Sequence, residues 1–276
     1  MKFIPMTLHY LRYSTKKWLD KFEQSPFDSF DLYMSAPQLN AFDYPLGDLI
    51  ELDRELRRRK LSVYSITPEN CTYPCNFGTQ NRETRESSLR YYQRVIDTAQ
   101  YLGCPNVQIS TGFGYFDAPA EEAWSHVQDS LVLLTEYAKR KNICLFLEEN
   151  KNTTTQVLVY ASDVAKMLAE VNADNLTGML DTDQMVFSGE TIEDYFQALG
   201  KKMGYVHFVD RAHLVPGDGD YNLEKIYKDL KRNGYDGVCC FEIMDRRYFQ
   251  DPDAAIDGCI EWLKKNTDEY KDYTGE

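Results

Sequence analysis

Four ionisable side chains in the second half of the sequence each follow or interrupt a short apolar run: Glu148, Asp181, His207 and Glu242. Glu242 is the clearest case, because it lies between Phe241 and Ile243 in an otherwise apolar segment. A carboxylate in such surroundings must be paired or bind a metal, since leaving it charged and isolated costs several kcal/mol. Each residue alone could belong to an ordinary buried salt bridge, but four on successive runs predict a metal site.

The types of donor atom narrow the choice of metal. Hard oxygen ligands with one imidazole nitrogen suit Mn²⁺, Co²⁺ or Mg²⁺, and Zn²⁺ is also compatible; Mn²⁺ is our first expectation. Alternation along a strand puts Phe146 and Glu148 on one face, so we assign Glu148 to the site and expect Glu149 to lie outside it or face a helix. Asp183 could replace Asp181, although it lies further beyond the apolar run.

Strands must bring these residues together. Eight short apolar runs, partly β-branched or aromatic and bounded by turn residues, favour strands at 3–8, 30–34, 61–66, 107–109, 143–147, 176–180, 205–209 and 238–243. Amphipathic helical patterns lie between them, so the strands pair in parallel through helical crossovers. At about 30 residues per strand–helix unit, eight units account for the whole chain. We therefore predict a (β/α)8 TIM barrel, with residues 1–276 as a single catalytic domain.

The helical patterns carry their own boundary signals. Apolar residues recur at three- and four-residue steps over 89–102, and Gly103 is expected to end that helix. Ser162 is expected to be the N-cap of the next helix but one. A doubly wound open sheet is the competing fold, but it usually shows Gly-x-Gly-x-x-Gly after its first strand, and none follows the run 3–8.

Composition and charge disfavour several classes of protein. Lys and Arg total 31 against 44 Asp and Glu, so the formal net charge is −13 and the summed field repels phosphate backbones. No run of about 18 apolar residues predicts a membrane span, and the first residues do not resemble a secretory signal. The seven cysteines have scattered spacings that do not indicate a disulfide framework. We therefore expect a reduced, cytoplasmic protein without a nucleic-acid or membrane partner.

The residues of the predicted site lie in segments that resemble family motifs. These segments are Leu147-Glu148, Leu180-Asp181-Thr182, Val206-His207-Phe208-Val209-Asp210, Pro216-Gly217-Asp218-Gly219 and Phe241-Glu242. Over essentially its whole length the chain resembles the xylose-isomerase-like barrels of the sugar phosphate isomerase/epimerase superfamily. Within it, the segments 66–70, 73–74 and 85–87 resemble the fructoselysine 3-epimerases, and the tagatose/psicose 3-epimerases are the next most similar branch.

The resemblance implies a xylose-isomerase-like TIM barrel that acts as a carbohydrate epimerase, an isomerase, on a ketose or ketosamine. The family's metal ligands match the four residues chosen above, and Glu148 and Glu242 also match its acid/base groups on opposite faces of the substrate. The tagatose-type enzymes have a histidine where this chain has Gln184, and an arginine where it has His213. Relatives form homodimers or homotetramers, which we expect here as well.

Epimerisation at C3 needs a base, a counter-acid and a group that stabilises the enediolate. A divalent metal bound to the carbonyl and its neighbouring hydroxyl would act as the Lewis acid. One glutamate would remove the proton and the other would return one to the opposite face. We expect substrate contacts from six residues: His9, Glu69, Tyr73, Gln184, Arg211 and His213. For His9 and Tyr73 a packing role is an equal alternative.

Three other functions stay open at this point. An inosose-type dehydratase would need a similar metal and acid/base pair. An endonuclease-IV-like hydrolase uses a histidine-rich multi-zinc site, and is disfavoured because the acidic chain has four histidines in all. A non-catalytic sugar-binding barrel would be expected to have lost ligands, yet all four are present.

Overall fold

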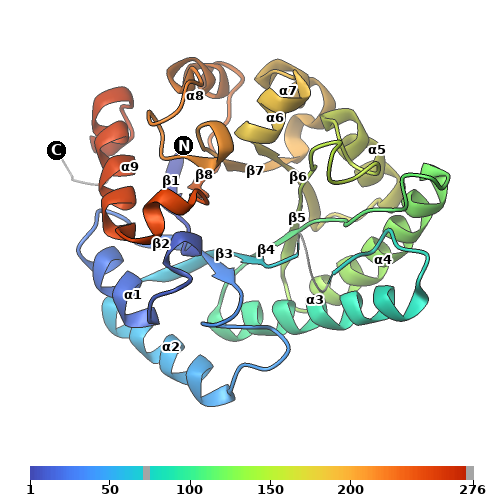
Figure 1. Ribbon diagram of the computed structural model, residues 1–276, viewed down its shortest axis with the longest axis horizontal. Coiled ribbons are helices and arrows are strands. Elements are labelled where there is room, and N and C mark those ends of the chain that lie inside the picture. Colours follow the sequence, from blue (N-terminus) through green and yellow to red (C-terminus); the bar gives the residue numbers. More distant parts are fainter. Residues whose placement is uncertain (71–74, 272–276) are drawn as a thin grey trace.

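The computed structural model describes residues 1–70 and 75–271 and places eight parallel strands in a ring surrounded by helices (Figure 1). The strands are β1 (Lys2–Pro5), β2 (Ser29–Met34), β3 (Ser62–Pro68), β4 (Asn106–Ile109), β5 (Cys144–Leu147), β6 (Leu176–Asp181), β7 (Met203–His207) and β8 (Val238–Phe241). Their order is β1-β8-β7-β6-β5-β4-β3-β2. A bridge between Met6 and Asp31 joins the remaining edges, and Thr7 N donates to Asp31 O at 3.1 Å. The predicted (β/α)8 barrel is confirmed.

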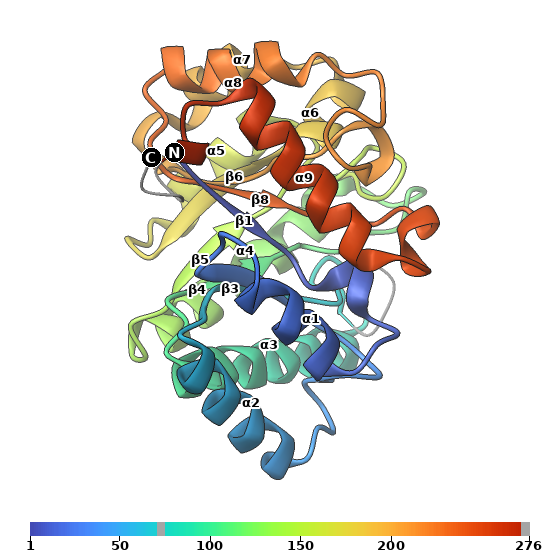
Figure 2. The same ribbon diagram turned by 90° about the vertical axis from the view of Figure 1, so that its left-hand side faces the viewer.

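Helices cover the outside of the ring. They are α1 (Thr15–Glu23), α2 (Leu46–Arg59), α3 (Arg82–Leu102), α4 (Ala120–Lys139), α5 (Ala161–Val171), α6 (Thr182–Ser188), α7 (Ile192–Leu199), α8 (Leu223–Arg232) and α9 (Pro252–Asn266). Short 3-10 turns lie at η1 (Leu8–Tyr10), η2 (Gly200–Lys202), η3 (Arg211–His213) and η4 (Arg246–Phe249). In the side view of Figure 2, the red helix α9 lies outside the pair β1 and β8.

Two clusters of buried apolar side chains hold the barrel together. The larger cluster packs the strands against the helices, with Trp18, Tyr92 and Phe208 among its fully buried members. The smaller cluster fills the inside of the ring and consists of Ile4, Met6, Leu8, Phe146, Met179, Tyr205, Val238 and Cys240. The rings of Phe146 and Tyr205 stack there at 4.8 Å between centroids. Since side chains alternate along a strand, these apolar residues share the interior face with the polar residues that end the same strands.

Several element boundaries differ from the predictions. β7 ends at His207 rather than at residue 209, and β1 ends at Pro5, because the chain turns into η1 at Leu8. The short helix α6, which begins directly after Asp181, was not predicted. The N-cap of α5 is Tyr160 and not Ser162, which is wrong by two residues, because the Asp163 carboxylate accepts from the Tyr160 amide at 3.0 Å.

The predicted end of the helix over 89–102 is confirmed. Gly103 ends α3 with a left-handed φ of 68°, a conformation that glycine adopts without steric cost. Among residues 1–70 and 75–271, no helix is both long and apolar enough to cross a membrane. In the same described part of the chain, the cysteines are free thiols at 75, 104, 144, 239, 240 and 259.

Candidate metal centre

Four ionisable groups from four neighbouring strands meet at the carboxyl end of the barrel. The Nδ1 atom of His207 lies 3.0 Å from Glu242 Oε2, 3.3 Å from Glu148 Oε1 and 3.8 Å from Asp181 Oδ2. One ligand atom of each residue lies within 4.8 Å of those of the other three. All four residues are buried, with Asp181 and His207 at 0% exposure and the two glutamates below 10%.

The strand ladder fixes where each of these side chains starts. Asp181 and His207 are the last residues of β6 and β7 and lie opposite each other in register. Glu148 is the first residue after β5, and its amide still donates to Ile109 O of β4 at 3.0 Å. Glu242 is the first residue after β8. Because parallel strands end on one side of a barrel, the four groups converge there.

Asp181 also begins the helix that follows it. Its Oδ1 atom accepts from the Gln184 amide at 2.8 Å, as an N-cap carboxylate does. That hydrogen bond leaves Oδ2 directed at the cluster, where it is buried and accepts no hydrogen bond from the residues that the structure describes. The unpredicted helix α6 therefore has a direct role, because its first turn orients one carboxylate of the site.

Neighbouring charges outweigh burial in setting the pKa of His207 and Glu242, whereas burial prevails for Glu148. Burial alone would lower the pKa of His207, yet Glu242 and Glu148 raise it well above its ordinary value. Burial raises the pKa of Glu148, whereas His207 and His213 outweigh burial and lower the pKa of Glu242. Three buried carboxylates beside one imidazole need compensating positive charge, which a divalent cation would supply.

The distances and the donor set fit a divalent cation. Ligands about 2.1 Å from one small ion lie about 3 Å apart when adjacent and about 4 Å apart when opposite. The separations of 3.0, 3.3 and 3.8 Å from His207 Nδ1 fall in that range. Both nitrogens of His207 are buried, and neither has a hydrogen-bond partner in the described part of the chain. Glu148, Asp181, His207 and Glu242 could therefore hold one ion between them.

A chain of amides supports Glu148 from behind. Gln108 Nε2 donates to Glu148 Oε2 at 2.5 Å, and Asn70 Nδ2 donates to Gln108 Oε1 at 3.0 Å. Asn70 in turn donates to the Tyr92 hydroxyl at 2.9 Å. Because one glutamate oxygen is occupied by Gln108, the other, Oε1, is the one that faces His207.

Glu149 turns away from the cluster, toward helix α7. Its Oε1 atom accepts from the Tyr195 hydroxyl at 2.6 Å and from the Asp181 amide at 3.4 Å. Burial raises the pKa of Glu149 to about 8. The orientation agrees with the prediction that Glu148 faces the site and Glu149 a helix.

The sequence of residues 19–266 matches the family described as xylose isomerase-like TIM barrel. The chain belongs to the xylose isomerase-like TIM barrel family. Fructoselysine 3-epimerase of Escherichia coli O157:H7 is 26% identical over 231 residues, which cover 82% of this chain and 84% of that protein. Inosose dehydratase of Clostridium perfringens is 26% identical over 168 residues, which cover 52% of this chain and 53% of that protein.

Solved structures of other proteins have the same barrel fold. The structure of L-ribulose 3-epimerase superimposes with a TM-score of 0.81 at 18% identity, covering 100% of this chain and 97% of that one. The predicted family is confirmed, and the relatives bear out the expectation of an isomerase of the carbohydrate epimerase type.

Three of the residues predicted to contact substrate, His213, Gln184 and Glu69, lie at the same end of this xylose isomerase-like barrel as the cluster. His213 joins the cluster, with Nε2 at 3.1 Å from Glu242 Oε2 and 3.2 Å from Asp181 Oδ2. Gln184 lies on the first turn of α6, and its buried side-chain oxygen has no hydrogen-bond partner within 1–70 and 75–271. Glu69 follows β3 at the same end of the barrel and accepts from the Tyr33 hydroxyl.

Two other residues predicted to contact substrate, Arg211 and His9, interact with residues outside the cluster. Arg211 is 62% exposed and pairs with Asp220 at 2.8 Å. His9 packs its ring against Tyr10 at 4.6 Å between centroids, and neither of its nitrogens has a hydrogen-bond partner among the described residues. Burial lowers the pKa of His9 to about 3, so it is neutral in the fold. Tyr73 lies outside the described residues.

Asp183 is close to the cluster but engaged by other groups. Its Oδ2 atom pairs with Lys151 at 2.5 Å, and its Oδ1 accepts from the Tyr221 hydroxyl at 2.8 Å and the Ala212 amide at 2.9 Å. The nearest approach to the centre is His213 Nδ1, at 3.6 Å from Asp183 Oδ2. Asp181, rather than Asp183, therefore faces His207.

Sequence reasoning missed Gln108 and Asp31, which are buried at 1% and 0% exposure near the site. Both interrupt apolar strands, Gln108 between Val107 and Ile109 in β4 and Asp31 in the first half of β2. A search for polar residues inside every apolar run, and not only at the ends of the last four, would have found them.

Proposed function

We propose that the protein is a metal-dependent carbohydrate 3-epimerase that acts on a ketose or a ketosamine, with the chain as a single catalytic domain. The observation that carries this proposal is the meeting of Glu148, Asp181, His207 and Glu242 around one point at the carboxyl end of the barrel. The similarity to fructoselysine 3-epimerase over 82% of the chain supports the substrate class.

The cation would be held by these four residues, with Mn²⁺ as our first expectation and Co²⁺, Mg²⁺ or Zn²⁺ as alternatives. When bound, it would polarise the ketose carbonyl and the neighbouring hydroxyl and stabilise the negative charge that develops on them. The buried, apolar interior below the site keeps bulk water away from that charge.

Glu148 and Glu242 would carry the proton transfers. They extend from β5 and β8, on different sides of the ring, and each has one oxygen within 3.3 Å of His207 Nδ1. One carboxylate takes the proton from C3 of the substrate, which leaves the enediolate. The other gives a proton to the opposite face of C3, so the configuration is inverted without net oxidation. Gln108 would hold Glu148 in place for this step through its 2.5 Å hydrogen bond.

His213 would bind substrate oxygens beside the centre. Its Nε2 lies between Asp181 and Glu242, and its Nδ1 faces Asp183, so a ring of carboxylates fixes its position. Its backbone has a left-handed φ of 58°, as does that of the preceding Ala212 at 55°. Two adjacent non-glycine residues in this conformation are costly, and such strain is retained where a side chain must be aimed at a site.

An inosose-type dehydratase is the second candidate, because inosose dehydratase of Clostridium perfringens is similar over about half of this chain. The same metal and glutamates could remove a proton and expel water from a cyclic polyol. An endonuclease-IV-like hydrolase is not favoured, since its multi-zinc site is rich in histidine, whereas three carboxylates and two histidines, His207 and His213, meet here. A non-catalytic barrel is not favoured either, because Glu148 is positioned by a chain of hydrogen bonds that binding alone would not require.

Solvent deuterium tests the proposal. The purified protein, first stripped of metal and then supplied with Mn²⁺, is incubated in D₂O with fructoselysine, D-tagatose, D-psicose and L-ribulose in turn. We expect one substrate to yield its C3 epimer with a single deuterium at C3, and the exchange to stop when the metal is removed.

Absence of exchange with every substrate would contradict an epimerase. A product lighter by one water from an inosose would support the dehydratase instead. The cytoplasmic location and a homodimer or homotetramer stay predictions, which fractionation and light scattering would test.

A further inference from the structure

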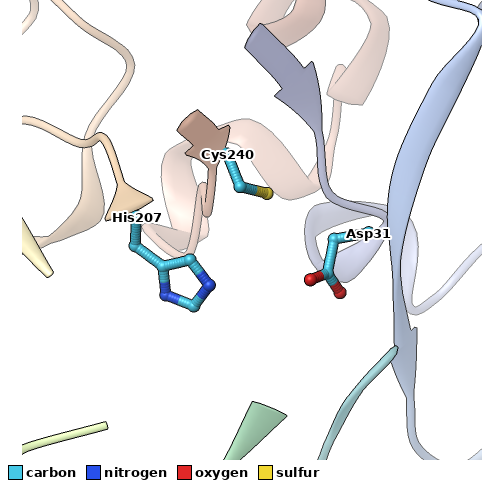
Figure 3. Close-up of side chains that lie close together, drawn as sticks. All are labelled: Asp31, His207 and Cys240. Carbon is cyan, nitrogen blue, oxygen red and sulfur yellow. The ribbon is translucent and has the colours of Figure 1, made fainter. Parts of the chain in front are cut away.

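A fourth carboxylate lies inside the barrel and has no part in the proposed reaction. Asp31, in the first half of β2, is fully buried. One ligand atom each of Asp31, His207 and Cys240 lies within 4.8 Å of the other two. Figure 3 shows the Asp31 carboxylate directed at the His207 ring from the far side of the barrel interior. A buried charge in this position needs a physical reason.

The imidazole of His207 has two nitrogens with different surroundings. Nδ1 faces the carboxylates of Glu148, Asp181 and Glu242 at 3.0 to 3.8 Å. The nitrogen on the Asp31 side in Figure 3 is therefore Nε2. This Nε2 atom is buried and has no hydrogen-bond partner among residues 1–70 and 75–271.

The Asp31 carboxylate is held rigidly by donors. Its Oδ1 accepts from the Thr67 amide at 3.1 Å, and its Oδ2 accepts from the Thr67 hydroxyl at 3.1 Å and the Tyr205 hydroxyl at 2.9 Å. Three donors on two oxygens suit an ionised carboxylate. They leave one of its roughly four lone-pair sites free, which is the site that a His207 Nε2–H would use.

We infer that Asp31 is a positioning residue for the metal centre, and that its charge keeps the His207 proton on Nε2 and the lone pair of Nδ1 toward the metal. The inference rests on the proposed function, because it assumes that His207 binds the metal through Nδ1. A neutral imidazole carries its single proton on either nitrogen, and a metal-binding histidine commonly offers the other N–H to a carboxylate. One His207 nitrogen and one Asp31 oxygen lie within 4.8 Å of each other, a separation that a single bridging water would span.

Metal affinity is the first test. Mn²⁺ is titrated into the metal-free protein, and unbound Mn²⁺ is measured by its electron paramagnetic resonance signal. We expect one Mn²⁺ per chain, bound about 10- to 100-fold more weakly by Asp31→Asn than by the unmodified protein. The matched control is Asp229→Asn on α8, since Asp229 is buried at 3% exposure and pairs with Lys225 and Arg232 away from the site. The control should bind Mn²⁺ as the unmodified protein does.

The tautomer gives a second readout that a merely structural role would not move. With Zn²⁺ as a diamagnetic probe and ¹⁵N-labelled histidine, the unmodified protein should show a slowly exchanging Nε2–H of His207. Asp31→Asn should shift that signal and speed its exchange with solvent. Tyr205→Phe keeps Asp31 but removes one of its donors. It should weaken Mn²⁺ binding about threefold, and it carries the test if Asp31→Asn does not fold.

Three results would overturn the inference. The first is a folded Asp31→Asn variant that binds Mn²⁺ within twofold of the unmodified protein and keeps the same Nε2–H signal. The second is two Mn²⁺ per chain, because the ion beside Cys240 would then use Asp31 as a ligand. The third is an unmodified protein that binds no Mn²⁺, which overturns the proposed function as well. If the unmodified protein binds Mn²⁺ and catalyses epimerisation, and Asp31→Asn binds Mn²⁺ equally well, this inference alone would be overturned.

Discussion

The two halves of the barrel ring have the same backbone plan but carry different chemistry. The strands β5 to β8 end in three carboxylates and one imidazole that face each other within 4.8 Å. The strands β1 to β4 and the residues directly after them contribute amides, hydroxyls and the carboxylates of Asp31 and Glu69, which bond to the second half or to each other. The second half holds the groups that would react, and the first half holds groups that orient them.

Two histidines make the contrast concrete. His9 and His207 are both buried, at 1% and 0% exposure. Burial lowers the pKa of His9 to about 3, whereas the surrounding carboxylates overcome burial and raise the pKa of His207 well above its ordinary value. Equal burial thus gives opposite outcomes, because the charge of the neighbours decides the sign.

The largest effect is expected in the second half. Glu242→Gln keeps the shape of the side chain but removes a proton acceptor, so kcat for epimerisation should fall about 10³-fold. Steady-state kinetics with Mn²⁺ measures this. Glu190→Gln is the matched control, because Glu190 accepts from the Ala161 amide at 3.1 Å outside the site and should leave kcat unchanged. A Glu242→Gln variant with more than a tenth of the normal kcat would remove Glu242 from the acid/base pair.

The next effect concerns His9 and the pH dependence of stability. Its pKa is about 3 in the fold, below the ordinary value of 6.5, so only the unfolded chain takes up this proton as the pH falls below 6.5. The free energy of unfolding should therefore decrease by about 2 kcal/mol between pH 7 and pH 5 on account of His9. His9→Phe, which can still pack on Tyr10, should lose about that much less over the same interval. Urea denaturation at the two pH values measures it, and equal losses in both proteins would contradict it.

The smallest effect belongs to the first half. Gln108→Met removes the hydrogen bond to Glu148 but leaves Glu148 Oε1 facing His207. Because a hydrogen bond to a charged group contributes about 1.5 kcal/mol, kcat should fall about tenfold while Mn²⁺ affinity changes less than threefold. Kinetics and metal titration together check this. A loss as large as that of Glu242→Gln would erase the distinction between the two halves.

The fold, and the meeting of four ionisable side chains at one end of it, could be predicted from the sequence because both depend on local patterns. Short apolar runs mark strands, and Glu148, Asp181, His207 and Glu242 each stand at the end of one, which is where a parallel barrel gathers them. The helix α6 was missed because it is only seven residues long and follows a strand directly, and its cap, Asp181, was already assigned to the metal.

What depends on long-range contact could not be predicted. Asp31 and His207 lie 176 residues apart in the chain. Ring closure between β1 and β2 lets Asp31 face His207 across the barrel interior. The placement of Arg211 in solvent and of His213 in the cluster likewise depends on the η3 turn, whose left-handed residues no spacing rule indicates. Arg211 and His213, two residues apart, therefore point to solvent and to the cluster, respectively.

The most direct measurement of the central claim is anomalous X-ray diffraction from crystals of the protein grown with Mn²⁺. We expect one anomalous peak per chain, within about 2.3 Å of His207 Nδ1 and of one oxygen each of Glu148, Asp181 and Glu242. A peak between Asp31 and Cys240, or no peak within reach of these four residues at saturating Mn²⁺, would contradict it.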